Sequence, residues 1–254
     1  MIYYIFDGSY NGYLSAFFAM YENKEFNAIP SLEEDMGNEL FSQKKTIHTD
    51  PQKAARIIKS LEKILGKHTT ALFFNNFLSE DRKAWLISFR LMIQIFKGNH
   101  FILKNYGHAD SLYFSDILKK VSRERHRMKA FIRFQKDEHD LYSAIIDPDF
   151  NVLPLIVRFF QNRYADQQWI IFDVKRNYGY HYDLRQVHEI IPSSSINQEQ
   201  ALAVPIDLDA KEPLYQLLWK TYFKSTNIES RKNLKLHIQH VPKRYWKYLV
   251  EKQD

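Results

Sequence analysis

Large apolar side chains recur at helical spacing through the first half of the chain, after one short alternating segment. Residues 2–6 alternate weakly and predict a first strand. Ser9 then provides a helix N-cap. The Asp50-Pro51 pair is typical of a helix start, because a capping carboxylate precedes a proline at the first helical position. We expect residues 50–128 to be mostly helical. Further helices are predicted at 79–97 and 110–127, and one or two short strands at 23–48.

The apolar segments become shorter after residue 128 and are separated by turn residues. They predict strands at 130–135, 141–146, 168–173, 178–182 and 185–191. The Asp147-Pro148-Asp149 turn is expected to start a helix that runs to about residue 163. Two strands, a helix and three strands joined by tight turns predict an antiparallel sheet with a helix on one face.

The C-terminal part is predicted to be helical again, at 212–228 and in a short last helix that begins at Val241. The expected fold class is therefore α+β, an antiparallel sheet with packed helices. We expect a single domain over 1–254. It can be subdivided into an N-terminal strand plus helical part (1–128) and an antiparallel sheet plus C-terminal helices (129–254).

Composition places the chain among soluble proteins of the cell interior. Its 254 residues are 45% hydrophobic, enough for a substantial core, but no apolar run approaches the roughly 18–20 residues that span a bilayer. The first residues reach Asp7 without a basic segment, which argues against a signal peptide. Cysteine is absent, and this excludes disulfides, thiolate nucleophiles and clusters bound by the chain's own thiolates. We expect a cytoplasmic protein without membrane attachment.

The net charge is only +6, so the distribution of the cations matters more than their sum. The first basic segment, residues 119–136, has eight Lys or Arg residues against one Glu. A helix-to-strand change near residue 129 would gather its arginines at one junction and offer guanidinium groups to phosphates. The alternative is a solvated helix end, where the helix dipole favours cations. The candidate nucleic-acid-binding residues here are Arg123, Arg125, His126, Arg127, Lys129 and Arg133.

The second basic segment, residues 220–252, has nine Lys or Arg residues against two Glu, with aromatic residues between them. Cations that meet phosphates and rings that offer stacking faces are typical of nucleic-acid binding. The alternative is a C-terminal helix that buries Trp246 and Leu249 and leaves its lysines in water. The candidates are Lys220, Lys224, Arg231, Lys232, Lys243, Arg244, Tyr245 and Trp246, with Tyr245 or Trp246 stacking on a base or anchoring the tail.

Evidence for catalysis or metal binding is weaker. Asp7, Asp173 and Asp183 flank predicted strands, where carboxylates can serve as acids, bases or metal ligands but more often cap turns. His237 and His240 have a spacing that suits one metal ion, yet no third ligand lies near them in the sequence and the adjacent cations would oppose it. Glycine-rich phosphate loops, nucleophile elbows and His-Glu-x-x-His motifs are absent. We therefore expect no metal and no cofactor, and we name no catalytic residue.

Several separated motifs together resemble a bacterial family of domains of unknown function described as probable DNA metabolism proteins. They are FDGSYNGYL (6–14), RHRMKAFIRF (125–134), RYADQQWIIFD (163–173), LWKTYFKSTNI (218–228) and HVPKRYWKYL (240–249). Members of that family accompany a radical-SAM protein of DNA modification or repair, and some relatives are fused to a uracil-DNA glycosylase. The resemblance implies a DNA repair or modification setting and a radical-SAM partner, but it supplies no catalytic residues.

Three hypotheses follow. The leading one is a nucleic-acid-binding accessory protein, with DNA as a more favoured partner than RNA and both basic segments on one phosphate-binding face. The second is an enzyme acting on nucleic acid through Asp7, Asp173 or a histidine in a concave pocket. The third is a protein-interaction module whose basic face docks an acidic partner such as the radical-SAM protein.

Overall fold

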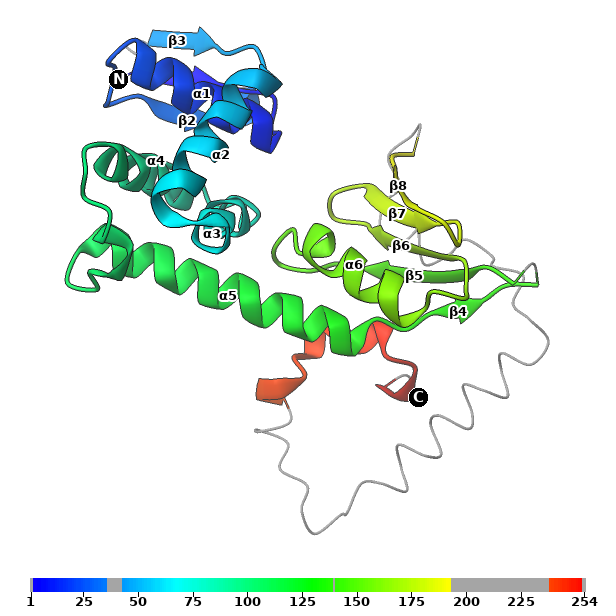
Figure 1. The fold of residues 1–254 in the computed structure, drawn as a ribbon. Helices are drawn as coiled ribbons and strands as arrows, with labels where there is room; N and C mark the ends of the chain where they lie inside the picture. Colours follow the sequence, from blue (N-terminus) through cyan, green and yellow to red (C-terminus); the bar gives the residue numbers. More distant parts are fainter. Residues whose placement is uncertain (1, 36–42, 139, 193–237, 253–254) are drawn as a thin grey trace. The chain divides into compact units, whose positions relative to one another are not determined.

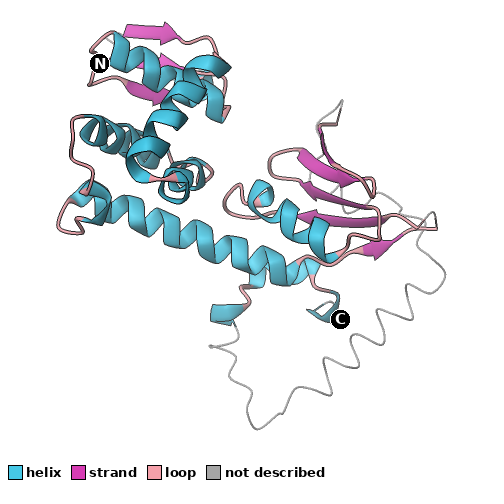
Figure 2. Cartoon of the chain, in the orientation of Figure 1, coloured by secondary structure: helices cyan, strands magenta, loops and turns pink. Residues whose placement is uncertain are grey.

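The chain divides into two compact units in a computed structural model that describes residues 2–35, 43–138, 140–192 and 238–252 (Figure 1). Unit 1 is Met1–Ser122 and unit 2 is Arg123–Asp254. The boundary falls inside one long helix, so that helix contributes residues to both units. The α+β class expected from the sequence is confirmed, because helices and sheets with antiparallel strands are packed together within the chain (Figure 2).

Unit 1 begins with a small parallel sheet. Its strands are β1 (Ile2–Ile5), β2 (Ile29–Ser31) and β3 (Gln43–Thr46), in the order β2-β1-β3. The first strand and the short strands expected at 23–48 are thus confirmed. Helix α1 (Tyr10–Glu22) joins β1 to β2, and Ser9 caps it as predicted, with its hydroxyl accepting a hydrogen bond from the Gly12 backbone N–H at 2.9 Å.

Helices make up the rest of unit 1, as the periodicity predicted. They are α2 (Pro51–Leu65), α3 (Lys67–Phe77), α4 (Arg82–Phe96) and the first part of α5 (Ala109–Phe131), with 3-10 turns at Glu33–Asp35 and Ile102–Lys104. Asp50 caps α2 as expected. Helix α4 starts later than predicted, because its N-cap is Asp81, whose side chain accepts from the Ala84 N–H at 2.8 Å.

An aromatic core holds these helices together. Tyr13 and Trp85 are at most 2% exposed, and the Tyr13 hydroxyl donates to the Trp85 carbonyl at 2.8 Å, which ties α1 to α4. The Phe77 and Trp85 rings stack with centroids 5.1 Å apart, and the Trp85 indole donates to the Phe77 carbonyl at 2.9 Å. The polar tips of these large side chains therefore keep partners inside the apolar interior.

Unit 2 is built on a five-stranded sheet. Its strands are β4 (Gln135–Lys136), β5 (Tyr142–Ile146), β6 (Trp169–Asp173), β7 (Tyr178–Tyr182) and β8 (Val187–Ile190), in sequential order. Helix α6 (Leu153–Arg163) packs on this sheet through Phe160, whose ring lies 6.5 Å from that of the fully buried Trp169. The strands expected at 141–146, 168–173 and 178–182 are confirmed, and that at 185–191 is shorter than predicted.

Three details of unit 2 correct the sequence predictions. Of the strand predicted at 130–135 only Gln135 is in a strand: α5 continues to Phe131, and the Arg133 guanidinium donates to the Ala130 carbonyl at 2.7 Å, which satisfies the end of the helix. The sheet is not wholly antiparallel, because β5 and β6 are parallel and α6 is the crossover between them. That helix begins at Leu153, several residues after the Asp147-Pro148-Asp149 turn.

The described end of the chain is a short 3-10 tail. It comprises Lys243–Tyr248 and Val250–Lys252, in place of a regular last helix, and packs beside the end of α5 (Figure 1). The helix predicted at 212–228 lies outside the described residues. No helix in the described part of the chain is both long and apolar enough to cross a membrane. The proposed subdivision at residue 128 and the single-domain assignment stay predictions.

Candidate functional site

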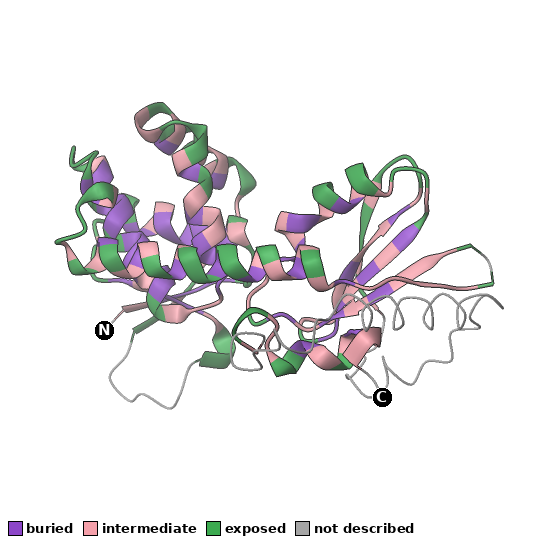
Figure 3. Ribbon diagram, turned by 90° about the horizontal axis from the view of Figure 1, so that it is seen from below, coloured by how far each residue is buried: buried purple, intermediate pink, exposed green. Residues whose placement is uncertain are grey.

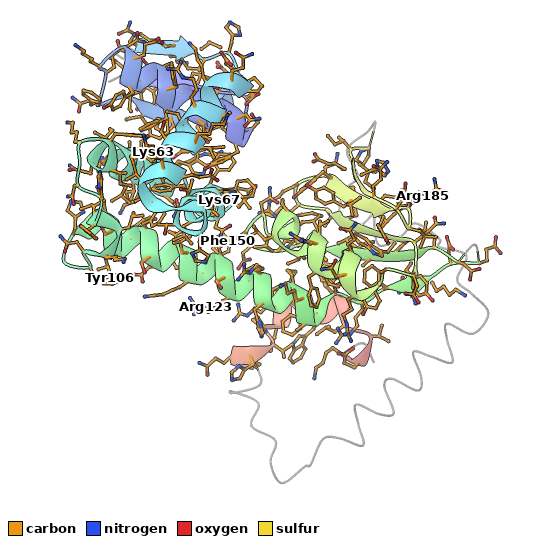
Figure 4. All side chains as sticks on the ribbon, in the orientation of Figure 1. Lys63, Lys67, Tyr106, Arg123, Phe150 and Arg185 are labelled. Atoms are coloured by element: carbon orange, nitrogen blue, oxygen red, sulfur yellow. The ribbon has the colours of Figure 1, made fainter. Side chains whose placement is uncertain are left out.

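The candidate arginines of the first basic segment lie on a continuous helix. Since an α-helix turns about 100° per residue, Arg123 and Arg127 share one side of α5, while Arg125 points about 200° away from Arg123. Arg123, labelled in Figure 4, and His126 are exposed, whereas Arg125, Arg127 and Lys129 are half-buried. The predicted gathering of these arginines at a helix–strand junction near residue 129 is therefore wrong, because the junction lies after Phe131.

Buried positions recur every three or four residues along α5, and exposed positions lie between them (Figure 3). In its C-terminal turns, Glu124 and Met128 are 1% and 2% exposed, and Ile132 just after the helix is 9% exposed. Met128, Ile132, Ile146, Tyr245 and Tyr248 line one small cavity, so the end of α5, strand β5 and the tail meet at this point. The buried position of Glu124 is unusual, because an ionised carboxylate is removed from water only when it is paired.

Glu124 organises the site. Its carboxylate accepts hydrogen bonds from the Tyr245 hydroxyl and, at 2.9 Å, from the Asp149 backbone N–H. The Arg244 guanidinium lies 3.3 Å from it and that of Arg127 3.8 Å. One buried carboxylate thus joins α5 to the loop after β5 and to the tail.

Tyr245 anchors the tail. It is 1% exposed, its ring lies 5.4 Å from that of Phe131, and its hydroxyl also accepts a hydrogen bond from Arg244 at 2.6 Å. Burial and the neighbouring Glu124 carboxylate raise the pKa of Tyr245, so the phenol stays protonated and donates a hydrogen bond to Glu124. Of the two roles expected for this ring, anchoring agrees with its burial, since base stacking requires an exposed face.

The tail also contacts the carboxyl end of strand β5. Arg244 forms an ion pair with Asp149 at 2.6 Å, and Lys247 forms one with Asp147 at 3.3 Å. Partial burial lowers the pKa of Arg244, but Tyr245, Glu124 and Asp149 outweigh that effect and raise it. Two cations of the second basic segment are therefore held by acids that follow β5.

Asp173 is fully buried at the end of β6, beside the same loop. It accepts from the Lys175 backbone N–H at 3.0 Å and pairs with Arg176 at 2.8 Å. Burial raises the pKa of Asp173, although Arg176 opposes this shift. Arg176 also donates to the Pro148 carbonyl at 3.1 Å. Both oxygens of Asp173 are thus engaged, and Arg176 joins the end of β6 to the loop after β5.

The three carboxylates considered for catalysis do not form one group. Asp7 lies in unit 1, where it accepts from the Ser9 and Thr49 hydroxyls, each at 2.7 Å. Asp183 follows β7 at the end of the sheet opposite Asp173, since Trp169 pairs with Tyr182 and Asp173 with Tyr178. Backbone N–H groups of Gln186 and Arg185, with His188, lower the pKa of Asp183.

The described part of the second basic segment, residues 238–252, contacts the first segment. The Arg127 guanidinium donates to the Gln239 carbonyl at 3.3 Å, and Arg133 pairs with Glu251 at 2.7 Å. Arg127, Arg133 and Arg244 therefore hold the segments together. Among the described residues, seven basic side chains of these segments have no acidic partner: Lys120, Arg123, Arg125, His126, Lys129, His240 and Lys243.

Aromatic rings accompany the cations of the tail. Lys243 and Lys252 lie over the Trp246 ring, 5.9 and 5.3 Å from its centroid, and Lys129 lies 4.7 Å from the Phe159 centroid. Trp246 is half-exposed and donates to the Val241 carbonyl at 3.0 Å. The other candidates, Lys220, Lys224, Arg231 and Lys232, lie outside the described residues, and so does His237. Within the described ranges, no group of three or more His, Asp or Glu residues could hold a metal ion.

Sequence reasoning missed Glu124, Asp149 and Arg176, which position the site. A signal for Glu124 is present, because it continues the buried positions Phe114, Ile117 and Val121 at alternating spacings of three and four residues. A carboxylate on the apolar stripe of a helix indicates a buried partner. Asp149 carries no such signal, since its partner Arg244 comes from a distant part of the chain. Arg176 pairs with Asp173 three residues before it, but its contact with the Pro148 carbonyl depends on the fold.

Comparison with models of known protein families shows the relationship of this chain. The model of the family described as Domain of unknown function (DUF4130) matches residues 82–251, which include α5, the whole described sheet of unit 2 and its tail as far as Glu251. No curated protein matches the chain. Since the matched region covers more than half of the sequence, the chain belongs to the DUF4130 family.

Proposed function

We propose that the protein binds nucleic acid, DNA in preference to RNA, through unit 2, as an accessory component of DNA repair or modification in the cytoplasm. The observation that carries this proposal is the meeting of the two basic segments around Glu124. Basic groups from α5 and from the tail belong to one compact unit, and several of them have no acidic partner among the described residues.

The paired and unpaired cations have different roles in this proposal. Arg127, Arg133 and Arg244 are held by Glu124, Glu251 and Asp149, so they fix the tail against the helix. The cations that lack an acidic partner in the described part of the chain provide the phosphate contacts, and such contacts release counterions from the nucleic acid. Affinity should therefore fall steeply as the salt concentration rises.

Fluorescence anisotropy with a labelled 20-base-pair DNA duplex, measured over a series of salt concentrations, tests the proposal. The variant carrying Arg123→Gln and Arg125→Gln should bind more weakly, and the slope of log affinity against log salt should decrease by about two, one for each phosphate contact removed. The matched control carries Arg158→Gln and Arg163→Gln, which removes two exposed arginines of α6. Binding that does not depend on salt, or an equal loss in the control, would contradict the proposal.

The preference for DNA is tested with an RNA duplex of the same sequence under the same salt conditions. We expect weaker retention of RNA, because its A-form helix presents phosphates with a different spacing and groove geometry. Equal affinity for both duplexes would leave nucleic-acid binding in place and remove the DNA preference.

The family resemblance supports a second candidate function, the docking of an acidic protein such as the radical-SAM companion. Electrostatic complementarity would use the same unpaired cations. Nuclease-treated protein should then retain the purified companion, and the Arg123→Gln, Arg125→Gln variant should lose it. Retention of the companion together with no affinity for the duplex would favour docking over nucleic-acid binding.

A further inference from the structure

A pocket of about 400 Å³ opens among the helices of unit 1, and its lining includes none of the residues assigned above. Helix α1 contributes Phe18, Tyr21 and Glu22, helix α2 contributes Arg56, Ile57 and Ser60, and helix α4 contributes Phe96. Pockets that hold small ligands are commonly of this size and combine an apolar lining with a few polar groups. We infer that it binds a nucleotide unit, an aromatic base that carries a phosphate.

The rings of the pocket provide the surface for the base. The Tyr21 and Phe96 rings lie 5.7 Å apart in an edge-to-face arrangement, and Tyr21 is 40% exposed although it is large and aromatic. Phe18 lies in the same lining and is only half-buried. Exposed aromatic rings around a small cavity suit a flat ligand, because every nucleobase has a face that stacks on an aromatic side chain.

The cations of the pocket provide the site for the phosphate. The exposed Arg56 guanidinium lies 4.9 Å from the Phe18 centroid and forms no ion pair with any described residue. The one carboxylate of the lining, Glu22, is paired with Lys53 at 3.7 Å. Lys59 and Lys63 follow Arg56 on α2 at spacings of three and seven residues, so they extend the positive charge along one side of the helix.

A peptide fits this site less well. The pocket walls are helical, so no strand edge is available for an extended peptide to pair with. Seven lining residues form a compact site, whereas a bound helix needs a groove that follows several of its turns. The pocket residues also lie outside residues 82–251 except for Phe96. The inference therefore does not depend on duplex binding by unit 2. An experiment can contradict nucleotide binding by the pocket without contradicting duplex binding, and the reverse also holds.

Saturation-transfer NMR and calorimetry on the full chain test the inference, with AMP, adenosine and a single-stranded dA6 oligonucleotide as probes. We expect AMP to bind more tightly than adenosine, because Arg56 contacts the phosphate. Tyr21→Ala and Arg56→Gln should each weaken AMP binding by about tenfold. Ser60→Trp should abolish it, because a large side chain would fill the pocket. Tyr106→Ala and Lys67→Gln are the controls, an exposed ring and an exposed cation outside the pocket.

The dA6 oligonucleotide distinguishes two possible ligands, a base within a single strand and a free nucleotide. If dA6 binds more tightly than AMP and competes with it, the pocket takes an unstacked base of a single strand; if only AMP binds, it takes a free nucleotide. Far-UV circular dichroism verifies that each variant is folded, and Ser60→Trp tests the site without removing any of its rings. The inference is overturned if neither probe responds to Ser60→Trp, or if N-acetylphenylalanine binds as tightly as AMP.

Discussion

Glu124 shows how one residue can decide the structure around it. Burying a carboxylate costs several kcal/mol, and the cost is offset only while its partners stay in place. Here the partners come from the loop after β5 and from the tail. Glu124 therefore holds together segments that are far apart in the sequence. Its burial therefore makes Glu124 the residue of the site whose substitution should have the largest effect.

Glu124→Ala should destabilise the protein by about 3–5 kcal/mol, because it leaves Arg244 and the Tyr245 hydroxyl without their buried partner. Urea denaturation followed by circular dichroism measures the change. The control Asp116→Ala removes an exposed carboxylate of the same helix, which pairs with Lys119 at 3.1 Å, and should cost less than about 1 kcal/mol. Equal effects of the two substitutions would show that the Glu124 contacts do not form in solution.

Asp7 gives a prediction about pH. Partial burial raises its pKa, but the hydrogen bonds from Ser9 and Thr49 outweigh this effect and lower it below the ordinary value. A lowered pKa in the folded state stabilises the protein above the ordinary carboxylate pKa, and this contribution is lost as the pH falls through the folded-state value. Asp7→Asn should thus destabilise the protein at pH 6 and have little effect near pH 2.

The exposure of Asp7 keeps this effect small, on the order of 0.5 kcal/mol after solvent screening. Urea midpoints of the wild type and of Asp7→Asn, compared at intervals from pH 6 to pH 2, give the measurement. Thr49→Val removes one of the donors and should reproduce part of the difference. A difference between Asp7→Asn and wild type that stays constant with pH would rule out the ionised carboxylate as its cause.

At the scale of elements, the tail is attached to the end of α5 by few groups, and Tyr245 is the most buried of them. Tyr245→Phe keeps the ring and removes the hydroxyl that bonds Glu124. An acceptor left without its donor costs about 1–3 kcal/mol. Hydrogen exchange in residues 243–252 should therefore become faster, while exchange in α6 stays unchanged. Trp246→Phe is the control, since Trp246 is half-exposed; a larger effect there would identify Trp246 as the anchor.

Local signals explain which elements could be predicted from the sequence. The caps Ser9 and Asp50 act on backbone groups a few residues away, so they are visible in the sequence. The end of α5 was missed because alternating residues after 129 have strand character, whereas the helix is continued by buried contacts and closed by Arg133. The parallel pairing of β5 with β6 depends on how α6 crosses the sheet, which periodicity does not encode.

The same distinction applies to the candidate site. Clustered charge was visible in the sequence, and so were Tyr245 and Trp246 as candidate anchors of the tail. The sequence does not reveal which cations are neutralised, because Glu124 and Arg244 are 120 residues apart and meet only in the folded unit. Several residues that were expected to contact phosphate, namely Arg127, Arg133 and Arg244, thus form ion pairs within the protein. Arg123 and Arg125 remain as the clearest candidates for nucleic-acid binding.

At the scale of the whole molecule, the division into two compact units predicts that each has its own stability. Leu61 in unit 1 and Ile156 in unit 2 are both fully buried, and truncating either to alanine should cost its unit about 2–5 kcal/mol. In native-state hydrogen exchange, Leu61→Ala should accelerate exchange through α2 and α4 and leave β6 unchanged; Ile156→Ala should do the reverse. Helix α5 should then respond in two parts, residues 109–122 to the first substitution and 123–131 to the second. If either substitution accelerates exchange equally in both units, the chain unfolds as one cooperative body, and the family region at 82–251 acquires its stability only together with the segment that precedes it.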